Sequence, residues 1–331
     1  MRERQIARTG VRLSEVGFGA ASLGNLYRET TDAEAEDAVD AAWSLGIRYF
    51  DTAPHYGLGL SERRLGRALR NYPRAEYAIS TKVGRLLVPN EFPVGSDNEG
   101  FVVPDDVVRV WDFSRDGIRR SLDASLERLG LEHVDILYAH DPDQADPDAG
   151  MRAAPFLVEL REQGLAGAVG VGTNSGIEAA RLFARTDLDV AMLAGRYTLL
   201  EQESLDDALR LASSLGRSVV AAGVFNSGLL ANSRPSGDSL YDYRPANGEL
   251  IRRVNSIADV CESFGVSLPQ AAIAFPLTHP RIVSVALGMR TALQVLRNVD
   301  LYDAGAPVAL WNALKKQGLM LNPAPIDQSM G

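Results

Sequence analysis

The strongest constraint on the fold is an alternation, repeated about eight times, of short β-branched apolar runs with longer segments of helical period. Strand, helix and strand in succession predict parallel strands joined by right-handed crossovers. The expected strands are residues 15–19, 47–51, 78–82, 134–140, 168–172, 190–193, 218–221 and 282–286. No linker or break in composition interrupts them, which favours a single α/β domain, a (β/α)8 TIM barrel over residues 1–331.

Three segments do not belong to this repeat. Residues 5–7 and 11–13 predict an N-terminal β-hairpin ahead of the barrel. Two long loops, residues 84–112 and 226–247, follow the C-terminal ends of strands, where such barrels carry their active sites. Loops of this length inside a compact domain are usually functional or mobile. We expect them to shape a pocket at the C-terminal face through aromatic side chains, namely Phe92, Phe101, Trp111, Tyr241 and Tyr243.

Charge and cysteine content narrow the class of protein. The net charge of −9 supplies no basic field, so neither a nucleic-acid partner nor an anionic membrane partner is expected. The single cysteine, Cys261, excludes an internal disulfide and a cysteine-based metal cluster, and it is expected on a buried helix face. No apolar run suggests a secretory signal or a membrane span. We expect a cytoplasmic protein, and the sequence leaves its oligomeric state open.

Four polar residues stand at or just past the ends of successive predicted strands: Asp51, Tyr56, Lys82 and His140. Each alone has an ordinary explanation, as a helix cap, a loop aromatic, a solvated strand end or a partner for a backbone carbonyl. Together they are harder to explain in that way, because a barrel brings the ends of neighbouring strands to one rim.

These four side chains suit acid–base chemistry. A free tyrosine has a pKa near ~10, and a neighbouring lysine ammonium stabilises the phenolate and lowers that pKa. The lysine in turn needs a carboxylate, because an unpaired buried ammonium is expensive. Lys82 beside Tyr56, with Asp51 as its partner, satisfies both conditions, and His140 is able to orient a substrate oxygen. Such a group holds an alcohol or carbonyl oxygen while a hydride moves on or off its carbon.

The run GIRYFDTAPHYGLGLSERRLGRAL, which contains Asp51 and Tyr56, resembles the aldo-keto reductase signature. The strands ISTKVG and DILYAHDPD, with Lys82 and His140, are similar to the next two motifs of that family, and GVGTNS is similar to its carboxamide-holding motif. The resemblance covers essentially the whole chain. It implies a (β/α)8 barrel, the catalytic tetrad named above, no metal, and an extended nicotinamide cofactor across the rim. The cofactor contacts that it implies are Gly19, Asp51, Thr173, Asn174, Phe225, Asn226, Ser227, Gly228, Gly288, Arg290, Gln294 and Asn298.

The chain departs from the family pattern around the cofactor. Ala194 replaces a glutamine that usually holds the carboxamide, and Ala222 falls near the tyrosine that usually stacks on the nicotinamide. Phe225 and Tyr197 are the two candidates to replace that stacking ring. Residues 226–228 are expected to begin a loop over the pyrophosphate, since backbone N–H groups suit an anion.

A second departure concerns the choice between NAD and NADP. Gly288 and Met289 replace a Lys-Ser pair that often binds a 2′-phosphate, although Arg290 remains nearby and could pair with that phosphate. NAD is therefore at least as well supported as NADP. Such departures are similar to those of the bacterial branch of L-fucose, D-threo-aldose 1- and pyridoxal 4-dehydrogenases, which oxidises cyclic hemiacetals to lactones. The resemblance thus implies a small-molecule substrate such as L-fucose, another aldose or pyridoxal.

The same residues are also compatible with other functions. The same residues acting in reverse would make an NADPH-dependent aldehyde or ketone reductase. Lys82 could form a Schiff base, as in an aldolase or lyase, or the barrel could serve as a cofactor-sensing channel subunit. Gly57-Leu58-Gly59 hints at a dinucleotide fingerprint, but the third glycine is absent and Tyr56 adjoins the loop, which disfavours a Rossmann fold.

Overall fold

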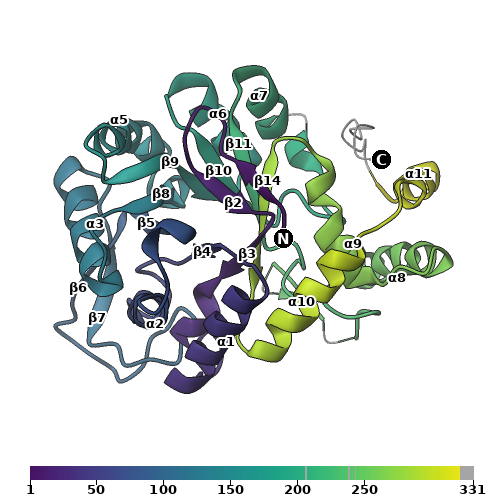
Figure 1. The fold of residues 1–331 in the computed structure, drawn as a ribbon, viewed down its shortest axis with the longest axis horizontal. Helices are drawn as coiled ribbons and strands as arrows, with labels where there is room; N and C mark the ends of the chain where they lie inside the picture. The colour runs from purple at the N-terminus through teal and green to yellow at the C-terminus, as the bar shows by residue number, and fades with distance from the viewer. Residues whose placement is uncertain (206, 238, 243, 321–331) are drawn as a thin grey trace.

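A closed barrel of parallel strands forms the centre of the protein (Figure 1). The computed structural model describes residues 1–320 apart from 206, 238 and 243. Within them the strands close in the order β3, β4, β5, β8, β9, β10, β11 and β14, with β14 paired to β3. Their bounds are Val16–Gly19, Tyr49–Asp51, Ala78–Val83, Val134–His140, Ala166–Thr173, Val190–Ala194, Ser218–Ala222 and Ile282–Gly288. The predicted fold class is confirmed, and each predicted strand coincides with a barrel strand to within two residues at either end.

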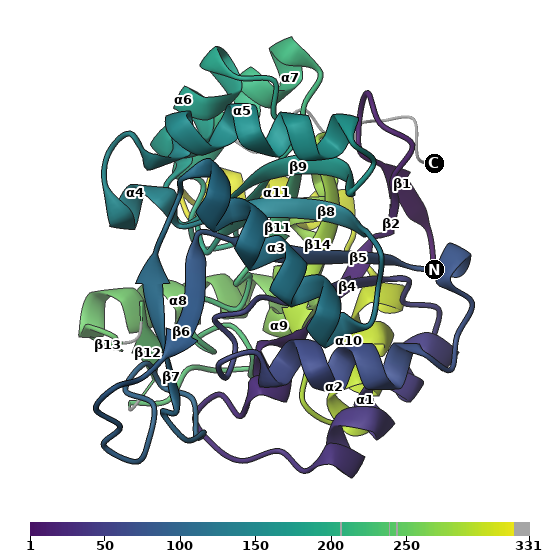
Figure 2. The same ribbon diagram turned by 90° about the vertical axis from the view of Figure 1, so that its left-hand side faces the viewer.

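Helices surround this barrel (Figures 1 and 2). They are α1 (Asp32–Ser44), α2 (Leu60–Leu69), α3 (Arg115–Leu129), α4 (Pro142–Ala145), α5 (Ala149–Glu162), α6 (Gly176–Arg185), α7 (Ala208–Leu215), α8 (Gly248–Ser263), α9 (Leu268–Ala274), α10 (Ala292–Ala304) and α11 (Val308–Lys316). Helix α1 begins in a capping box: the Thr31 hydroxyl accepts from the Glu34 N–H, and the Glu34 carboxylate accepts from the Thr31 N–H. Cys261 is buried on α8, as expected.

The N-terminal hairpin closes the end of the barrel opposite to the catalytic rim. Its strands are β1 (Glu3–Gln5) and β2 (Arg12–Ser14), so the predicted hairpin exists but its first strand lies two residues earlier than expected. Arg4 donates to the carbonyl of Ile282 (2.9 Å), and the Ala7 N–H donates to the Ser218 hydroxyl (2.9 Å). These are the first residues of β14 and β11, and hence the hairpin lies across the N-terminal ends of the strands.

The long segment after β5 is a second hairpin rather than an irregular loop, which corrects the sequence-based expectation. Strands β6 (Arg85–Pro89) and β7 (Val107–Trp111) pair antiparallel beside the barrel (Figure 2). The turn between them bends back, and Phe101 forms a bridge to Leu26. Arg109 then fastens the turn through Asp97, with 2.6 Å between Nη1 and Oδ1.

The other long connection, after β11, also contains a short ladder, β12 (Leu240–Tyr241) with β13 (Arg244–Pro245). The Tyr241 hydroxyl donates to Glu201 at 3.0 Å, which ties this connection to the segment after β10. Tyr243, one of the predicted pocket aromatics, lies outside the described residues.

The helices are short compared with the length of a membrane span. In the described part of the chain, no single helix is both long and apolar enough to span a bilayer. The segments Gly248–Ser263 and Leu268–Thr278 meet the criterion only when they are counted together, and they meet at 90°.

Candidate active site

Strand register places Asp51, the first of the predicted catalytic residues. At the C-terminal ends of the strands, Gly288 pairs with Gly19, Gly19 with Asp51, and Asp51 with Ser80. This row crosses four neighbouring strands, because parallel strands present their carboxyl ends at one rim. Two glycines, Gly288 and Gly19, therefore lie next to the Asp51 carboxylate along this rim.

A buried ion pair lies beneath the rim. Lys82 Nζ lies 2.8 and 2.7 Å from the two carboxylate oxygens of Asp51 and donates to the carbonyl of Thr52 at 2.9 Å. The Ser80 hydroxyl donates to the same carboxylate at 2.7 Å. Burial opposes the charge of Lys82, yet the Asp51 carboxylate and Tyr56 outweigh it, so that the pKa of Lys82 lies above its ordinary value. A Schiff-base lysine needs a lowered pKa, which counts against the aldolase reading.

Tyr56 lies over this pair, with Lys82 Nζ 4.7 Å from the centre of its ring. Its loop is tightly constrained, because Gly57 has φ +62° and a Cβ at that position would lie 2.2 Å from the Gly24 carbonyl oxygen. Burial raises the pKa of the Tyr56 phenol, Lys82 opposes that effect, and the pKa remains above its ordinary value. The sequence predicted that Lys82 would lower this pKa; the effect is present, but desolvation is larger.

His140 completes the predicted group from the end of β8. Its ring centre lies 6.1 Å from that of Tyr56, and its Nδ1 atom is buried without a hydrogen-bond partner among the described residues. Burial, and then the positive charges of Arg85 and Lys82, hold the pKa of His140 well below its usual range. A neutral imidazole next to the phenol suits hydrogen bonding to a substrate oxygen. The structure thus brings all four predicted residues to one place.

Sequence reasoning missed a polar network beside His140. Asp141 Oδ2 lies 3.6 Å from His140 Nε2 and accepts from Arg85 Nη2 at 2.6 Å. Arg85 also approaches Nδ1 of His55 at 3.4 Å. The His55 ring lies edge-on to His140 at 5.5 Å, and burial followed by the charge of Arg85 lowers the pKa of His55 to about 2. The DILYAHDPD motif contained Asp141, but its partner comes from a different hairpin.

The predicted pocket aromatics separate into two groups. The Phe101 ring, 3% exposed, lies 5.2 Å from His55 and 6.2 Å from Tyr56, and Trp111 lies under the Arg85 guanidinium at 4.4 Å. Both belong to the walls of the site. Phe92 is 81% exposed and does not line an enclosed pocket.

The predicted carboxamide pair lies at the C-terminal end of β9, where Thr173 is the last residue of the strand and Asn174 follows it. The Thr173 hydroxyl donates to Asp143 at 3.0 Å and accepts from the Ser175 N–H, while Asn174 is exposed. Ala194 and Ala222 are register partners at the ends of β10 and β11, so the two positions where the family usually has large side chains lie side by side. They leave a surface of small residues at this part of the rim.

The expected pyrophosphate loop has an unusual backbone. Asn226, Ser227 and Gly228 have φ values of +45°, +58° and +94°. The N–H groups of Asn226 and Gly228 donate to the carbonyls of Gly223 and Phe225, so these two groups stabilise the turn itself. The buried Oδ1 of Asn226 has no partner among the described residues. An orphaned polar atom beside a strained turn fits a site that is completed by a ligand.

The two candidates for the stacking ring differ in position. Tyr197 is fully buried, with its ring 5.2 Å from Phe275 and 5.9 Å from His279 in the layer outside the barrel. Phe225 is only partly buried, directly before the strained turn. Of the two, only Phe225 remains placed to stack on a nicotinamide.

At the adenosine end, Gln294 and Asn298 stand one turn apart on the same face of α10, as contacts to one base require. Arg290 is engaged elsewhere, since its guanidinium donates to the carbonyls of Leu26 (2.5 Å) and Arg28 (3.0 Å) ahead of α1. This arrangement does not support the prediction that Arg290 pairs with a 2′-phosphate. Gly288 is exposed, and a Cβ at that position would meet no atom within 4 Å.

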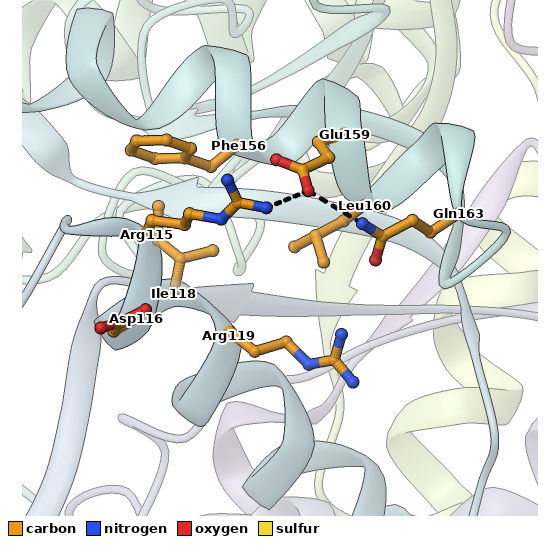
Figure 3. A pocket seen from close by; sticks show the side chains of 8 residues that line it. All are labelled: Arg115, Asp116, Ile118, Arg119, Phe156, Glu159, Leu160 and Gln163. Atoms are coloured by element: carbon orange, nitrogen blue, oxygen red, sulfur yellow. Dashed lines mark hydrogen bonds and ion pairs between the residues drawn. The ribbon is translucent and has the colours of Figure 1, made fainter.

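A groove elsewhere on the molecule is separate from this centre. It lies between α3 and α5, and an ion pair between Arg115 and Glu159 crosses it (Figure 3). None of the predicted catalytic or cofactor residues lines it. Among the residues described, no cluster of three His, Cys, Asp or Glu side chains could hold a metal ion.

A phenol set above a buried lysine, at the open end of a (β/α)8 barrel, is an arrangement suited to proton transfer at an alcohol or carbonyl oxygen. The sequence profile of the Aldo/keto reductase family matches residues 15–314. The chain belongs to this family, and it is an NAD(P)-dependent enzyme.

Several known proteins resemble it closely. A D-threo-aldose 1-dehydrogenase from Pseudomonas sp is 44% identical over 97% of this chain and 99% of its own length. A pyridoxal 4-dehydrogenase from Microbacterium luteolum is 38% identical over 96% of this chain and 98% of its own. Among solved structures, an aldo-keto reductase from Bacillus halodurans in its holo form superposes with a TM-score of 0.76 at 25% identity, with 100% of both chains covered.

Proposed function

We propose that the protein oxidises a cyclic hemiacetal, an aldose or pyridoxal, to its lactone, with NAD as the preferred cofactor and Tyr56 as the acid–base residue. The observation that carries the proposal is the Asp51–Lys82 pair, buried directly beneath the Tyr56 ring and beside a neutral His140. The 44% identity to a D-threo-aldose 1-dehydrogenase supports the substrate class.

Each residue has a defined role in this reaction. His140 donates a hydrogen bond to the hydroxyl oxygen on the anomeric carbon and orients it. Tyr56, in its phenolate form, accepts the proton of that hydroxyl as the C–O double bond of the lactone forms. Lys82 stabilises the phenolate, and Asp51 keeps Lys82 charged and in position. The bound oxidised nicotinamide supplies the acceptor for the hydride that leaves the anomeric carbon.

The preference for NAD rests on the adenosine end of the site. The Arg290 guanidinium is bonded to backbone carbonyls, and Gly288 has no side chain with which to meet a 2′-phosphate. Of these two described residues, neither offers a free cation to that phosphate, which must still be desolvated when it binds.

One observation favours a second function, an NADPH-dependent aldehyde or ketone reductase. The raised pKa of Tyr56 keeps its phenol protonated at neutral pH, which is the form that donates a proton to a carbonyl oxygen. In that direction the tetrad has the same roles with the proton moving the opposite way.

The two functions are separated by the absorbance of the reduced cofactor with purified protein. The panel contains NAD⁺ or NADP⁺ with L-fucose, other aldoses and pyridoxal, and NADPH with simple aldehydes. Reduction of NAD⁺ by a member of the first panel is the expected result. If no member of the first panel reduces NAD⁺ or NADP⁺ and simple aldehydes oxidise NADPH, the reductase would replace the dehydrogenase as the proposed function.

A further inference from the structure

The polar network beside His140 is larger than the tetrad needs. Asp141 and Arg85 lie at the mouth of the site, and their side chains are only 19% and 10% exposed. Burying a charged pair contributes little to stability, because desolvation offsets the attraction between the two charges. Asp141 also has φ +44° and ψ +51°, a left-handed conformation that is unfavourable for a residue with a Cβ. A strained backbone and a buried pair together point to a role in binding.

The hydrogen-bonding groups that the pair leaves unused indicate which ligand it recognises. Oδ2 of Asp141 accepts from Arg85, whereas Oδ1 accepts from none of the residues that the structure describes. Burial raises the pKa of Asp141, and the charge of Arg85 opposes that effect. The Arg85 guanidinium also lies near Gln144 Oε1 (3.4 Å) and Glu99 Oε2 (3.5 Å), while its buried Nε has no partner among the described residues. The pair therefore offers an acceptor on Asp141 and a donor on Arg85 side by side. A sugar hydroxyl both donates and accepts, so a pair of adjacent hydroxyls satisfies both groups.

We propose that Asp141 and Arg85 recognise the hydroxyls next to the anomeric carbon of an aldose, which makes the protein an aldose dehydrogenase rather than a pyridoxal dehydrogenase. This inference rests on the proposed oxidation of a hemiacetal. His140 faces the anomeric oxygen in that reaction, and Asp141 is its neighbour in the chain, with 3.6 Å between Nε2 and Oδ2. The group one carbon away from the reacting centre therefore lies within reach of the pair.

Pyridoxal fits this arrangement less well. Its ring nitrogen could approach Asp141 only as a pyridinium cation, and the Arg85 guanidinium 2.6 Å from the same carboxylate disfavours a second positive charge. The faces of Phe101 and Trp111 suit the C–H surface of a sugar or an aromatic ring equally, so the polar pair decides between the two substrates.

The test compares three substrates in the full-length protein: the aldose oxidised fastest in the panel above, its 2-deoxy analogue, and pyridoxal. In the wild type, loss of the 2-hydroxyl is expected to lower kcat/KM about 10- to 100-fold, as for a hydrogen bond to a charged group. Asp141→Asn should lower kcat/KM for the parent aldose by a similar factor, mainly through KM, and largely abolish discrimination against the deoxy sugar. Arg85→Lys, which keeps the charge but loses the fork, should give a smaller loss of the same kind.

Glu159→Gln is the matched control, since it removes a carboxylate paired with arginine in the groove of Figure 3, and it should leave all three substrates unaffected. Binding of the reduced cofactor, followed by fluorescence, checks that each variant is folded. An equal loss of kcat for every substrate in Asp141→Asn would overturn the inference, because Asp141 would then only position His140. Wild-type oxidation of pyridoxal but of no aldose would overturn it while leaving hemiacetal oxidation intact. Oxidation of neither would remove the proposed function, and the inference with it.

Discussion

The two halves of the barrel mouth are built on different principles. At the ends of β4, β5 and β8, the residues Asp51, Lys82 and His140 are buried, charged or polar, and closely packed. At the ends of β10, β11 and β14, the rim carries Ala194, Ala222 and Gly288, and a turn of left-handed residues follows β11. The first half is pre-organised by its own contacts. The second half presents backbone and small side chains, and we expect the cofactor to bind there.

From this difference we expect proton transfer and cofactor binding to be carried out by separate halves of the barrel mouth. In the proposed reaction, proton transfer needs fixed electrostatics, and the first half has a buried ion pair and a neutral histidine. Cofactor binding needs a surface that accepts a long molecule and releases it, and we expect the small residues of the second half to form that surface. Variants in the first half should therefore change catalysis, and variants in the second half should change cofactor affinity.

The largest effect is expected from Tyr56→Phe. Removal of the phenol oxygen abolishes proton transfer and should lower kcat by about 10³-fold or more, within the range of general acid–base catalysis. Cofactor affinity, measured by fluorescence titration, should stay nearly unchanged. Tyr72→Phe, which removes a phenol that donates to Asp40 on α1, is the control and should keep most of the activity. Retained activity in Tyr56→Phe would rule out the mechanism.

The next effect concerns pH. The phenolate of Tyr56 is the reactive form for oxidation, and its pKa is raised, so kcat for oxidation should increase as pH rises above neutral. Lys82 lowers that pKa, and its removal should therefore move the rising limb to still higher pH. Lys82→Met should cost about 100-fold in kcat at pH 7. Lys82→Arg keeps a charge and should move the profile less. A pH profile of Lys82→Met that coincides with that of the wild type would contradict this role.

A smaller effect, on cofactor affinity, is expected from a substitution in the second half of the barrel mouth. Phe225→Ala removes the ring that we expect to stack on the nicotinamide, and it should weaken cofactor binding about 10-fold, as for the loss of an aromatic contact. The pH profile of kcat should stay in place, because no titrating group changes. A shifted profile would show that the two halves are coupled.

The smallest effect is expected from Gly288→Lys. The exposed position has room for a side chain, and a lysine there restores a cation near the expected 2′-phosphate. The ratio of kcat/KM for NADP⁺ over NAD⁺ should rise about 5-fold, as for an exposed ion pair. Ala309→Lys, at an exposed position of α11, controls for net charge. An unchanged ratio would place the phosphate elsewhere.

The barrel and the tetrad were predictable because their signals are local. The strand Val134–His140 is apolar from Ile136 to Ala139, and its bounds were predicted to the residue. The β6–β7 hairpin was not predicted, because its strands are separated by a long turn and pair only through non-local contacts. The partners of Arg290 lie more than 260 residues away in sequence, so no spacing indicated that its guanidinium would bind carbonyls instead of a phosphate.

The electrostatic outcome at Tyr56 was only half predictable. The sequence indicated which charge lies beside the phenol, but the balance depends on desolvation, and desolvation follows from packing by Phe101 and His55. The Asp141–Arg85 ion pair was not predicted either, because its two residues come from different elements that only the fold brings together.

The pairing of β14 with β3 has a consequence for synthesis on the ribosome. The first barrel strand, Val16–Gly19, finds one of its two neighbours only when Ile282–Gly288 has been translated. Until then the nascent sheet has two open edges, which invite pairing with other chains. The N-terminal hairpin also lacks late-translated partners until then. Arg4 donates to the Ile282 carbonyl, and Glu15, directly after the hairpin, accepts from the Tyr302 hydroxyl. Ribosome-bound chains that end before residue 282 should therefore depend on chaperones far more than the released protein does.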